Sequence, residues 1–324
     1  MTTINLSTSV SIKNSELSIS HKTPVLLIGS CFTESIGGKL EENKFDVFSN
    51  PTGIIFNPIS VVNTLKRVFE NRKFTGNDLK NYNDKWISFE HHGSFSSFNK
   101  ETCLTEINES IVNANQHLKK SKTIFITLGS AWVYECKGVG VVANCHKIPN
   151  KNFTKRLLSV KEILSAFEQI TVELKDFNVV FTVSPVRHAK DGLHENNLSK
   201  ATLLLAINNL VEQQANYHYF PAYELVIDEL RDYRFFKDDL VHPTEMAVNY
   251  VWEKFKSCYF NEDTELLVNE VQKIKQAVNH KPFSFESKEH QQFIQKQIGL
   301  MNGLTEKYPF LNFKAEVEQI NTPK

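Results

Sequence analysis

Two short stretches of this 324-residue chain carry side chains whose types and spacing suit covalent catalysis. In the first, Gly29, Ser30 and Cys31 follow four consecutive apolar residues, so a hydroxyl and a thiol stand at a sharp turn. In the second, Asp239 precedes His242 by three residues. An Asp at this spacing can hold one ring nitrogen of a histidine and leave the other to activate a nucleophile. Together, the two stretches would supply the nucleophile, base and orienting acid of an acyl-transfer site.

Each stretch also has a purely structural interpretation. Cysteine is among the most frequently buried residue types, so Cys31 could be a core thiol beside an inert Ser30. Asp239 and His242 stand before Pro243, which we expect to start a helix, and short polar clusters often only satisfy a helix N-terminus. Of the two nucleophile candidates we favour Cys31, because of its position and because a thiolate is the more reactive group.

The elements around these stretches indicate a mostly parallel β-sheet. Five short apolar runs have the length of strands: 25–28, 45–48, 123–128, 178–183 and 223–227. Segments with helical spacing separate them, as in βαβ units, so we expect an α/β fold with three layers, α/β/α. The turns that follow parallel strands lie at one edge of the sheet, which would place Cys31 and His242 on the same side.

The rest of the chain is predicted to be helical or irregular. Helical spacing is clearest in six segments: 33–42, 58–69, 106–118, 160–174, 199–210 and 243–255. We expect long polar loops at 72–105 and 135–158, and an extended lead-in at 1–23 that suits an edge strand. Residues 261–324 show helical spacing only. We therefore predict a main domain over residues 1–260 and a helical C-terminal extension, 261–324, packed on it.

Composition argues against several classes of protein. Lys plus Arg and Asp plus Glu each number 37, so the formal net charge is zero and nothing suggests a nucleic-acid partner. We find no signal peptide and no apolar run long enough for a membrane anchor. The five cysteines form no C-x-x-C pair, which points to a reducing cytoplasm and against a metal site. No cofactor is expected, since the dinucleotide-like pattern Gly138-x-Gly140-x-x-Ala143 does not directly follow a strand.

Five segments, taken in chain order, resemble the motifs of one family. They are Gly29-Ser-Cys-Phe-Thr33, Asn50-Pro-Thr-Gly-Ile-Ile-Phe-Asn-Pro58, Thr127-Leu-Gly-Ser-Ala-Trp-Val-Tyr134, Thr182-Val-Ser-Pro-Val-Arg-His188 and Asp239-Leu-Val-His-Pro243. Over residues 24 to about 256 the chain resembles the GSCFA family of the SGNH or GDSL-like hydrolase superfamily. The resemblance implies a flavodoxin-like fold of SGNH type and chemistry on ester bonds.

The resemblance also implies a role for each residue of the first motif. In the superfamily's Gly-Asp-Ser motif the third residue is the nucleophile. Here Cys31 takes that place and Ser30 stands where the Asp would be; a one-residue shift of the turn would make Ser30 the nucleophile instead. A thiolate at Cys31 would be stabilised by His242 and by the helix N-terminus, which can lower a thiol pKa well below its free value.

The oxyanion hole of the superfamily uses a backbone amide after the nucleophile, a glycine in a second block and an asparagine in a third. Gly53 fits the second-block glycine, because the absence of a side chain lets its N–H approach a substrate. In the third block Gly129 is present, but Ala131 stands where the asparagine would be. Loss of one such donor typically slows a reaction on the order of 100- to 1000-fold. Ser130, or backbone near Gly129, is the candidate replacement.

Two further pairs of residues carry weaker signals. Arg187 and His188 follow the strand at 178–183 and should border the same cleft, where the guanidinium could hold a carboxylate or phosphate of a substrate. A salt bridge to a nearby acid is the alternative for Arg187. His91 and His92 lie in a polar loop, and we expect both at the surface unless that loop folds over the cleft.

These residues favour an ester hydrolase or an O-acyltransferase. Cys31 or Ser30 would attack an acyl carbonyl, His242 would accept and return the proton, and Asp239 would orient His242. The resemblance suggests a small-molecule or acylated-carbohydrate substrate, with either water or a sugar hydroxyl as acceptor. The alternative is a non-catalytic binding or assembly protein that kept the cleft, which Ala131 supports and the Asp239–His242 pair opposes.

Overall fold

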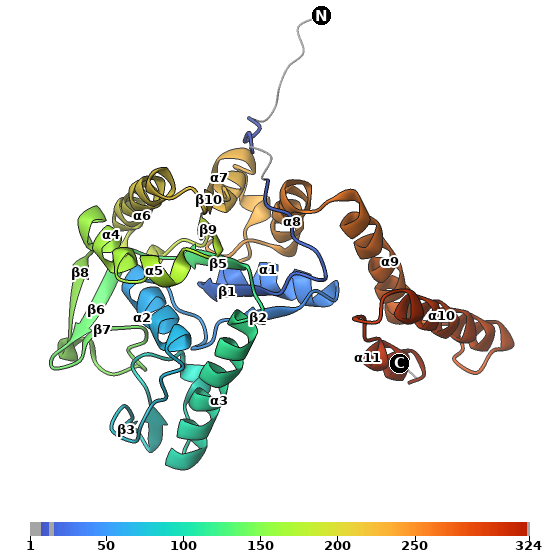
Figure 1. Cartoon of the computed structure of the whole chain (residues 1–324), viewed down its shortest axis with the longest axis horizontal. Coiled ribbons are helices and arrows are strands. Elements are labelled where there is room, and N and C mark those ends of the chain that lie inside the picture. The colour runs from blue at the N-terminus through green and yellow to red at the C-terminus, as the bar shows by residue number, and fades with distance from the viewer. Residues whose placement is uncertain (1–7, 13–15, 323–324) are drawn as a thin grey trace, which may run out of the picture.

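A five-stranded parallel sheet forms the centre of the computed structural model, which describes residues 8–12 and 16–322 (Figure 1). Its strands are β1 (Val25–Gly29), β2 (Val47–Ser49), β5 (Thr123–Leu128), β9 (Asn178–Val183) and β10 (Tyr217–Tyr219). Their order across the sheet is β10-β9-β5-β1-β2. The chain begins near one edge, adds β2 outside β1 and then crosses back, which is the order of flavodoxin-like folds.

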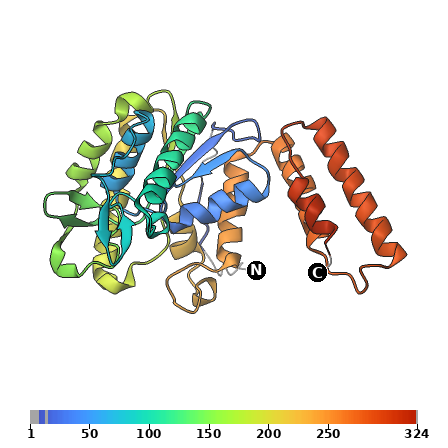
Figure 2. The ribbon, with the colours of Figure 1, turned by 90° about the horizontal axis from the view of Figure 1, so that it is seen from below.

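Helices cover both faces of this sheet, so the predicted three-layer α/β/α architecture is confirmed (Figures 1 and 2). One face carries α1 (Cys31–Glu42) and α8 (Glu245–Tyr259); the other carries α2 (Pro58–Phe69), α3 (Lys100–Leu118), α4 (Val160–Glu168) and α6 (Leu193–Gln213). Successive residues of a strand point to opposite faces. Leu26 and Ile28 therefore pack under α2 and α3, whereas Val25 and Leu27 pack against α1 and α8.

The turn from β1 into α1 is tightly built. Gly29 has φ +142°, and a Cβ there would lie 2.1 Å from the carbonyl oxygen of Thr127 on the neighbouring strand. The N–H of Gly29 donates to Asn50 Oδ1 at 2.8 Å, and the N–H of Ser30 donates to Thr127 O at 3.1 Å. Glycine is required here because β1 and β5 approach too closely for a side chain. This turn holds Cys31 at the start of α1.

Several helix ends form as their local sequence predicts. Asn57 caps α2 by accepting the N–H of Ser60 at 2.8 Å, with Pro58 at the first helical position. Ser159 and Glu162 form the predicted capping box at the start of α4. These interactions join residues three apart, so the sequence alone can specify them.

The two predicted polar loops contain strands, so that prediction is wrong. Segment 135–158 forms most of a three-stranded antiparallel sheet made of β6 (Trp132–Cys136), β7 (Gly140–Val142) and β8 (Phe153–Leu157). Segment 72–105 contains the hairpin of β3 (Lys80–Tyr82) and β4 (Lys85–Ile87), and α3 begins at Lys100. These strands are mostly half exposed, and they are held by pairing with each other and by a small apolar cluster that includes Ile87 and Val142.

The strand predicted at 223–227 is also wrong. The last strand is β10, and the chain then forms α7 (Ala222–Glu224) and a π-helix over Leu225–Glu229. The buried residues Ala222, Leu225 and Val226 follow the spacing of a helix, which explains the difference. Shorter helical segments are α5 (Thr171–Leu174) and the 3-10 turns Gly93–Phe95, Asn150–Asn152, Ala189–Asp191 and Tyr233–Phe235.

The chain before β1 does not form the predicted edge strand where it is described. Residues 8–12 and 16–23 have no strand, and the remainder of the predicted segment, 1–7 and 13–15, lies outside the described residues. At the other end of the domain, α8 begins at Glu245 after a Thr244 cap, so Pro243 precedes the helix rather than starting it.

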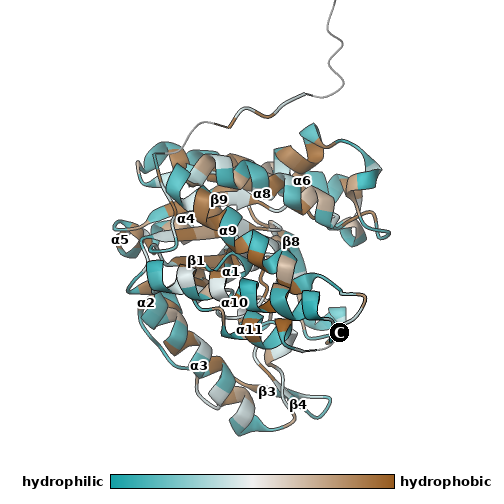
Figure 3. Cartoon of the chain, turned by 90° about the vertical axis from the view of Figure 1, so that its right-hand side faces the viewer, coloured by the Kyte–Doolittle hydropathy of each residue, from teal (hydrophilic) through white to brown (hydrophobic). Residues whose placement is uncertain are grey.

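The C-terminal segment is helical, as predicted, and has an apolar core of its own. It consists of α9 (Glu262–Asn279), α10 (Lys288–Lys307) and α11 (Lys314–Ile320), whose apolar faces meet while polar faces look outward (Figures 2 and 3). Contacts with the rest of the chain include an ion pair of Lys44 with Glu316. Val268 of α9 joins the core under α1 and α8 instead. No helix in the described part of the chain is both long and apolar enough to cross a bilayer.

Candidate active site

Cys31 and His242 line the same cavity, which has a volume of about 340 Å³. Cys31 is the first residue of α1, and His242 lies in the loop that leads into α8. Val186, Lys237 and Pro243 are among the other residues of the wall. The cavity stands at the carboxyl edge of the sheet, where parallel α/β folds place ligands. The structure thus brings together the two residues that the sequence placed 211 positions apart.

Asp239 orients His242 through a ring nitrogen, as predicted. Asp239 Oδ2 lies 2.7 Å from His242 Nδ1, and Asp239 Oδ1 accepts the backbone N–H groups of Val241 and His242, both at 2.9 Å. The N–H of His242, the N–H of Val241 and the imidazole lower the pKa of Asp239 to about 2. An ionised carboxylate can only accept, so Nδ1 carries the hydrogen and Nε2 is free to accept a proton.

Ser30 and Cys31 differ in exposure although they are adjacent. Ser30 is 1 % exposed, and its Oγ has no hydrogen-bond partner among the described residues. It packs so closely on Gly129 that a Cβ added there would lie 3.2 Å from Ser30 Cβ. Cys31 is half-buried and is a free thiol. It forms part of the cavity wall, whereas Ser30 does not.

Burial decides the acidity of the Cys31 thiol. It raises the pKa of Cys31, and this effect outweighs the lowering by the backbone N–H groups of Cys31 and Phe32 and by the charge of Lys200. Glu34 raises the pKa of the thiol further. The expected net lowering of this pKa is therefore not found: the helix N-terminus acts in the predicted direction, but desolvation is stronger.

Lys200 is a component of the site that the sequence reasoning missed. This α6 residue is 1 % exposed, and its Nζ donates to the carbonyls of Gly129 and Ser184, both at 2.7 Å. One signal was available. Lys200 lies one turn before Leu203 on the apolar stripe of its helix, where a charged residue is out of place unless it has partners.

The Gly53 amide is already engaged in the structure. Gly53 lies in a tight turn with φ +75°, and its N–H donates to the carbonyl of Asn50 at 2.8 Å. A Cβ at this position would lie 2.4 Å from the Cβ of His92, so glycine is needed for packing as well. The donation of this N–H to a substrate oxygen stays a prediction.

The third block joins the end of β5 to the loop between β2 and α2. The N–H groups of Gly129 and Ser130 both donate to the carbonyl of Phe56, at 2.8 and 3.0 Å. Ser130 Oγ accepts the N–H of Trp132 at 3.0 Å. Ala131 is fully buried in the core under α2, α3, α4 and α6. None of these residues belongs to the wall of the Cys31 cavity, and their role toward a substrate stays a prediction.

Arg187 lies in a neighbouring cavity rather than beside Cys31. That second cavity, also about 340 Å³, is lined by Asp228, Arg231 and Phe236 as well. The guanidinium of Arg187 lies 5.5 Å from the centre of the Phe236 ring. Because Val186 lines the first cavity and Arg187 the second, the two cavities adjoin each other along the chain after β9.

His188 is half-buried and close to the charged groups of the site. Burial, followed by the charge of Lys200, lowers the pKa of His188 to about 4, and the charge of His242 acts in the same direction. The His188 ring meets the ring of Phe56 edge to face at 5.4 Å. At neutral pH His188 is therefore uncharged, and it does not line the cavity that Cys31 and His242 share.

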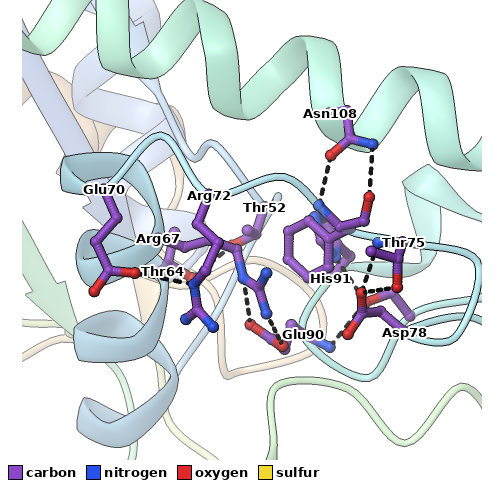
Figure 4. Close-up of polar contacts among 12 residues, drawn as sticks. Thr52, Thr64, Arg67, Glu70, Arg72, Thr75, Asp78, Glu90, His91 and Asn108 are labelled. Atoms are coloured by element: carbon purple, nitrogen blue, oxygen red, sulfur yellow. Dashed lines mark hydrogen bonds and ion pairs between the residues drawn. The ribbon is translucent and has the colours of Figure 1, made fainter.

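His91 is fully buried, so its predicted surface position is wrong. Its Nδ1 lies 2.9 Å from Ser88 Oγ, whereas Nε2 has no partner within the described ranges. Beside it, Arg67 forms an ion pair with Glu90 at 2.8 Å (Figure 4). Burial lowers the pKa of His91 to about 3, so the ring is neutral. This cluster stands apart from the Cys31 cavity.

The described residues contain no group of three His, Cys, Asp or Glu side chains that could hold a metal ion.

Comparison with known proteins adds two findings. The sequence model of the GSCFA family matches residues 24–255, and that of the GSCFA domain protein, C-terminal domain, matches residues 271–322. No curated protein is significantly similar to the chain.

Proposed function

The chain belongs to the GSCFA family, and we propose that it hydrolyses or transfers acyl groups of esters through an SGNH-like site with Cys31 as nucleophile. The observation that carries this proposal is the shared cavity. Cys31 and His242 line it together, and Asp239 holds the remaining ring nitrogen of His242 at 2.7 Å. Nucleophile, base and orienting acid are the three roles that such chemistry needs.

The proposed reaction has two steps. His242 takes the proton of the Cys31 thiol, and the resulting thiolate attacks the acyl carbonyl. The carbon–oxygen bond of the ester breaks, and the leaving alcohol takes that proton from His242. A thioester on Cys31 results. His242 then removes a proton from water or from an acceptor hydroxyl, which attacks the thioester and restores the thiol. Asp239 stabilises the imidazolium between the steps.

The exposure of the two candidates supports Cys31 over Ser30. A nucleophile must meet its substrate, and Cys31 is part of the cavity wall while Ser30 is 1 % exposed beneath it. The N–H groups of Cys31 and Phe32 already surround the thiol at the start of α1. We propose that these amides stabilise the oxyanion and take over part of the role of the missing third-block asparagine.

We propose a small ester, of the acylated-carbohydrate class, as substrate. A cavity of about 340 Å³ suits an acyl group with part of a sugar, at the lower end of the usual range for ligand pockets. A balanced net charge gives no reason to propose a nucleic-acid or membrane partner. A reducing compartment such as the cytoplasm would keep the free thiol of Cys31 active.

A test is to trap the acyl-enzyme with an activated acetyl ester and locate it by peptide mass spectrometry. We expect one acetyl group on Cys31, lost in Cys31→Ala and retained in Ser30→Ala. Neutral hydroxylamine should remove it, since it cleaves thioesters faster than serine esters. His242→Ala should slow its formation by about 100-fold or more, the usual contribution of general base catalysis. Lys237→Ala, which changes another wall residue, is the matched control.

Two observations favour a second function. Burial raises the pKa of Cys31, and the N–H of Gly53 is occupied, as would suit a protein that binds an ester or sugar without turning it over. Absence of any acyl adduct on wild type, together with unchanged ligand binding in Cys31→Ala, would establish this alternative. An adduct that still forms in Cys31→Ala but not in Ser30→Ala would identify Ser30 as the nucleophile.

A further inference from the structure

Lys200 is a buried cation without an acidic partner. It is 1 % exposed on α6, and no Asp or Glu pairs with it within residues 8–12 and 16–322. A lysine taken out of water is costly unless its charge is compensated. Two carbonyl groups, of Gly129 and Ser184, accept its hydrogen bonds at 2.7 Å each, but carbonyls supply no negative charge.

The two carbonyls place Lys200 under the nucleophile. Gly129 follows β5 and Ser184 follows β9, so the amine stands at the carboxyl edge of the sheet beneath the start of α1. Ser30, the residue before Cys31, packs directly on Gly129. Lys200 itself does not line the cavity that Cys31 and His242 share.

The charge of Lys200 is coupled to that of Cys31. Burial lowers the pKa of Lys200 to about 7, and an ionised Cys31 raises it; the charge of Lys200 in turn lowers the pKa of the thiol. Other titratable groups near the pair are His188, whose pKa is lowered first by burial and then by Lys200, and Glu34, which opposes ionisation of the thiol. The Tyr223 ring lies 5.9 Å from Lys200 Nζ.

We propose that Lys200 is a positioning residue whose buried positive charge favours ionisation of Cys31. Its two carbonyl partners hold the amine beside the turn that carries Ser30 and Cys31. When His242 takes the proton of the Cys31 thiol, the ammonium of Lys200 stabilises the thiolate that remains. The inference rests on the proposed function, in which Cys31 is the nucleophile.

This arrangement gives His242 and Lys200 different tasks. His242 carries the proton from the thiol to the leaving group and later from the acceptor back to the sulfur, whereas Lys200 supplies a fixed positive charge. Burial disfavours an isolated thiolate. A buried ammonium is the group that can offset this cost.

The test measures the rate at which iodoacetamide alkylates Cys31 in the full chain as a function of pH, with Cys31 followed by peptide mass spectrometry. Lys200→Gln keeps two N–H donors for the carbonyls but has neither charge nor basicity. We expect it to move the alkylation midpoint to higher pH and to slow the reaction at pH 7 by about tenfold or more, as expected for loss of a nearby opposite charge. Lys200→Met should do the same.

Lys256→Gln is the matched control, because Lys256 is also buried but pairs with Glu253 at 2.8 Å on α8. Its alkylation profile should overlay that of wild type. Circular dichroism identifies any variant that fails to fold. If Lys200→Met does not fold, Lys200→Gln alone provides the test. A Lys200→Gln profile identical to wild type would overturn the inference. Because no ester is turned over, this result is independent of whether an acyl-enzyme forms.

Discussion

Asp239 and Lys200 act on the same site from opposite environments. Asp239 is exposed, and its pKa of about 2 results from three hydrogen bonds within its own loop. Lys200 is buried, and its pKa of about 7 results from desolvation by elements distant in the sequence. The first charge is a local property that would be present in any fold that forms this loop. The second depends on the complete packing of α6 on the sheet.

His91 shows the same dependence on packing and predicts how stability changes with pH. Burial lowers its pKa from 6.5 to about 3. Between these pH values the unfolded chain therefore binds a proton at His91, whereas the folded chain does not. The contribution of His91 to stability is complete above about pH 6.5 and is lost as pH falls toward about 3. The slope due to this one group is at most about 1.4 kcal/mol per pH unit.

Urea unfolding of wild type and His91→Phe at pH 7, 6 and 5 checks this prediction. We expect the free energy of unfolding to fall less steeply with acid in His91→Phe, while other buried histidines such as His188 and His146 keep part of the slope. His280→Phe changes an exposed histidine and should leave the slope unaltered. Equal slopes in wild type and His91→Phe would contradict a neutral buried ring.

At the scale of elements, the turn between β1 and α1 determines where Cys31 lies. Three chain segments meet there: β1 itself, β5 through the carbonyl of Thr127, and the loop after β2 through Asn50 Oδ1. Asn50 adopts φ +50°, which turns its side chain back onto Gly29. Because these contacts come from both neighbouring strands, α1 can begin only where the sheet permits it.

Gly29→Ala is therefore expected to destabilise the protein by about 3 kcal/mol or more, through strain at φ +142° and a backbone clash at 2.1 Å. Gly38→Ala is the matched change in the same region. Gly38 lies inside α1 with no atom within 4 Å of its added Cβ, so the substitution should stabilise by about 0.5–1 kcal/mol. Chemical denaturation of both variants measures the difference. If the free energy of unfolding of Gly29→Ala were as high as that of Gly38→Ala, β1 and β5 would be able to separate and admit a side chain.

At the scale of the whole molecule, two bodies of apolar packing differ in kind. The sheet and its helices share cores that draw residues from across residues 19–268. The core of α9, α10 and α11 draws mainly on residues 267–320. Ion pairs of Lys44 with Glu316 and of Lys275 with Glu42 join the two, and such surface pairs typically contribute little each.

We expect the C-terminal helices to open without the sheet. Ile294→Ala removes a side chain that is 1 % exposed in their core and should cost about 2–4 kcal/mol within these helices. Hydrogen exchange should then accelerate in α9–α11 while β1, β5 and β9 stay protected. Leu300→Ala, at a residue 50 % exposed on the same helix, should have little effect. Equal acceleration in the sheet would mean that the whole chain unfolds as one unit.

The sequence by itself determined the features that depend on neighbours along the chain. The strands 123–128 and 178–183 follow from continuous apolar runs, and the caps at Asn57 and Ser159 from side chains that reach only three residues onward. The pairing of Asp239 with His242 is of the same kind, since both lie in one loop. Parallel topology then brought this loop to the edge where Cys31 stands.

Only the tertiary structure decided the features that depend on distant partners. The three-stranded sheet of β6, β7 and β8 depends on pairs between distant residues, such as Trp132 with Leu157, and on a small apolar cluster with Ile87 and Phe89 from another segment. Lys200 is held near the site because the carbonyls of Gly129 and Ser184, which follow two different strands, accept its hydrogen bonds in the buried interior. The desolvation of a group depends on all the elements that pack around it, so a short stretch of sequence cannot predict it. For this reason the sequence indicated the Cys31 thiol, but the packing of the fold determines its pKa.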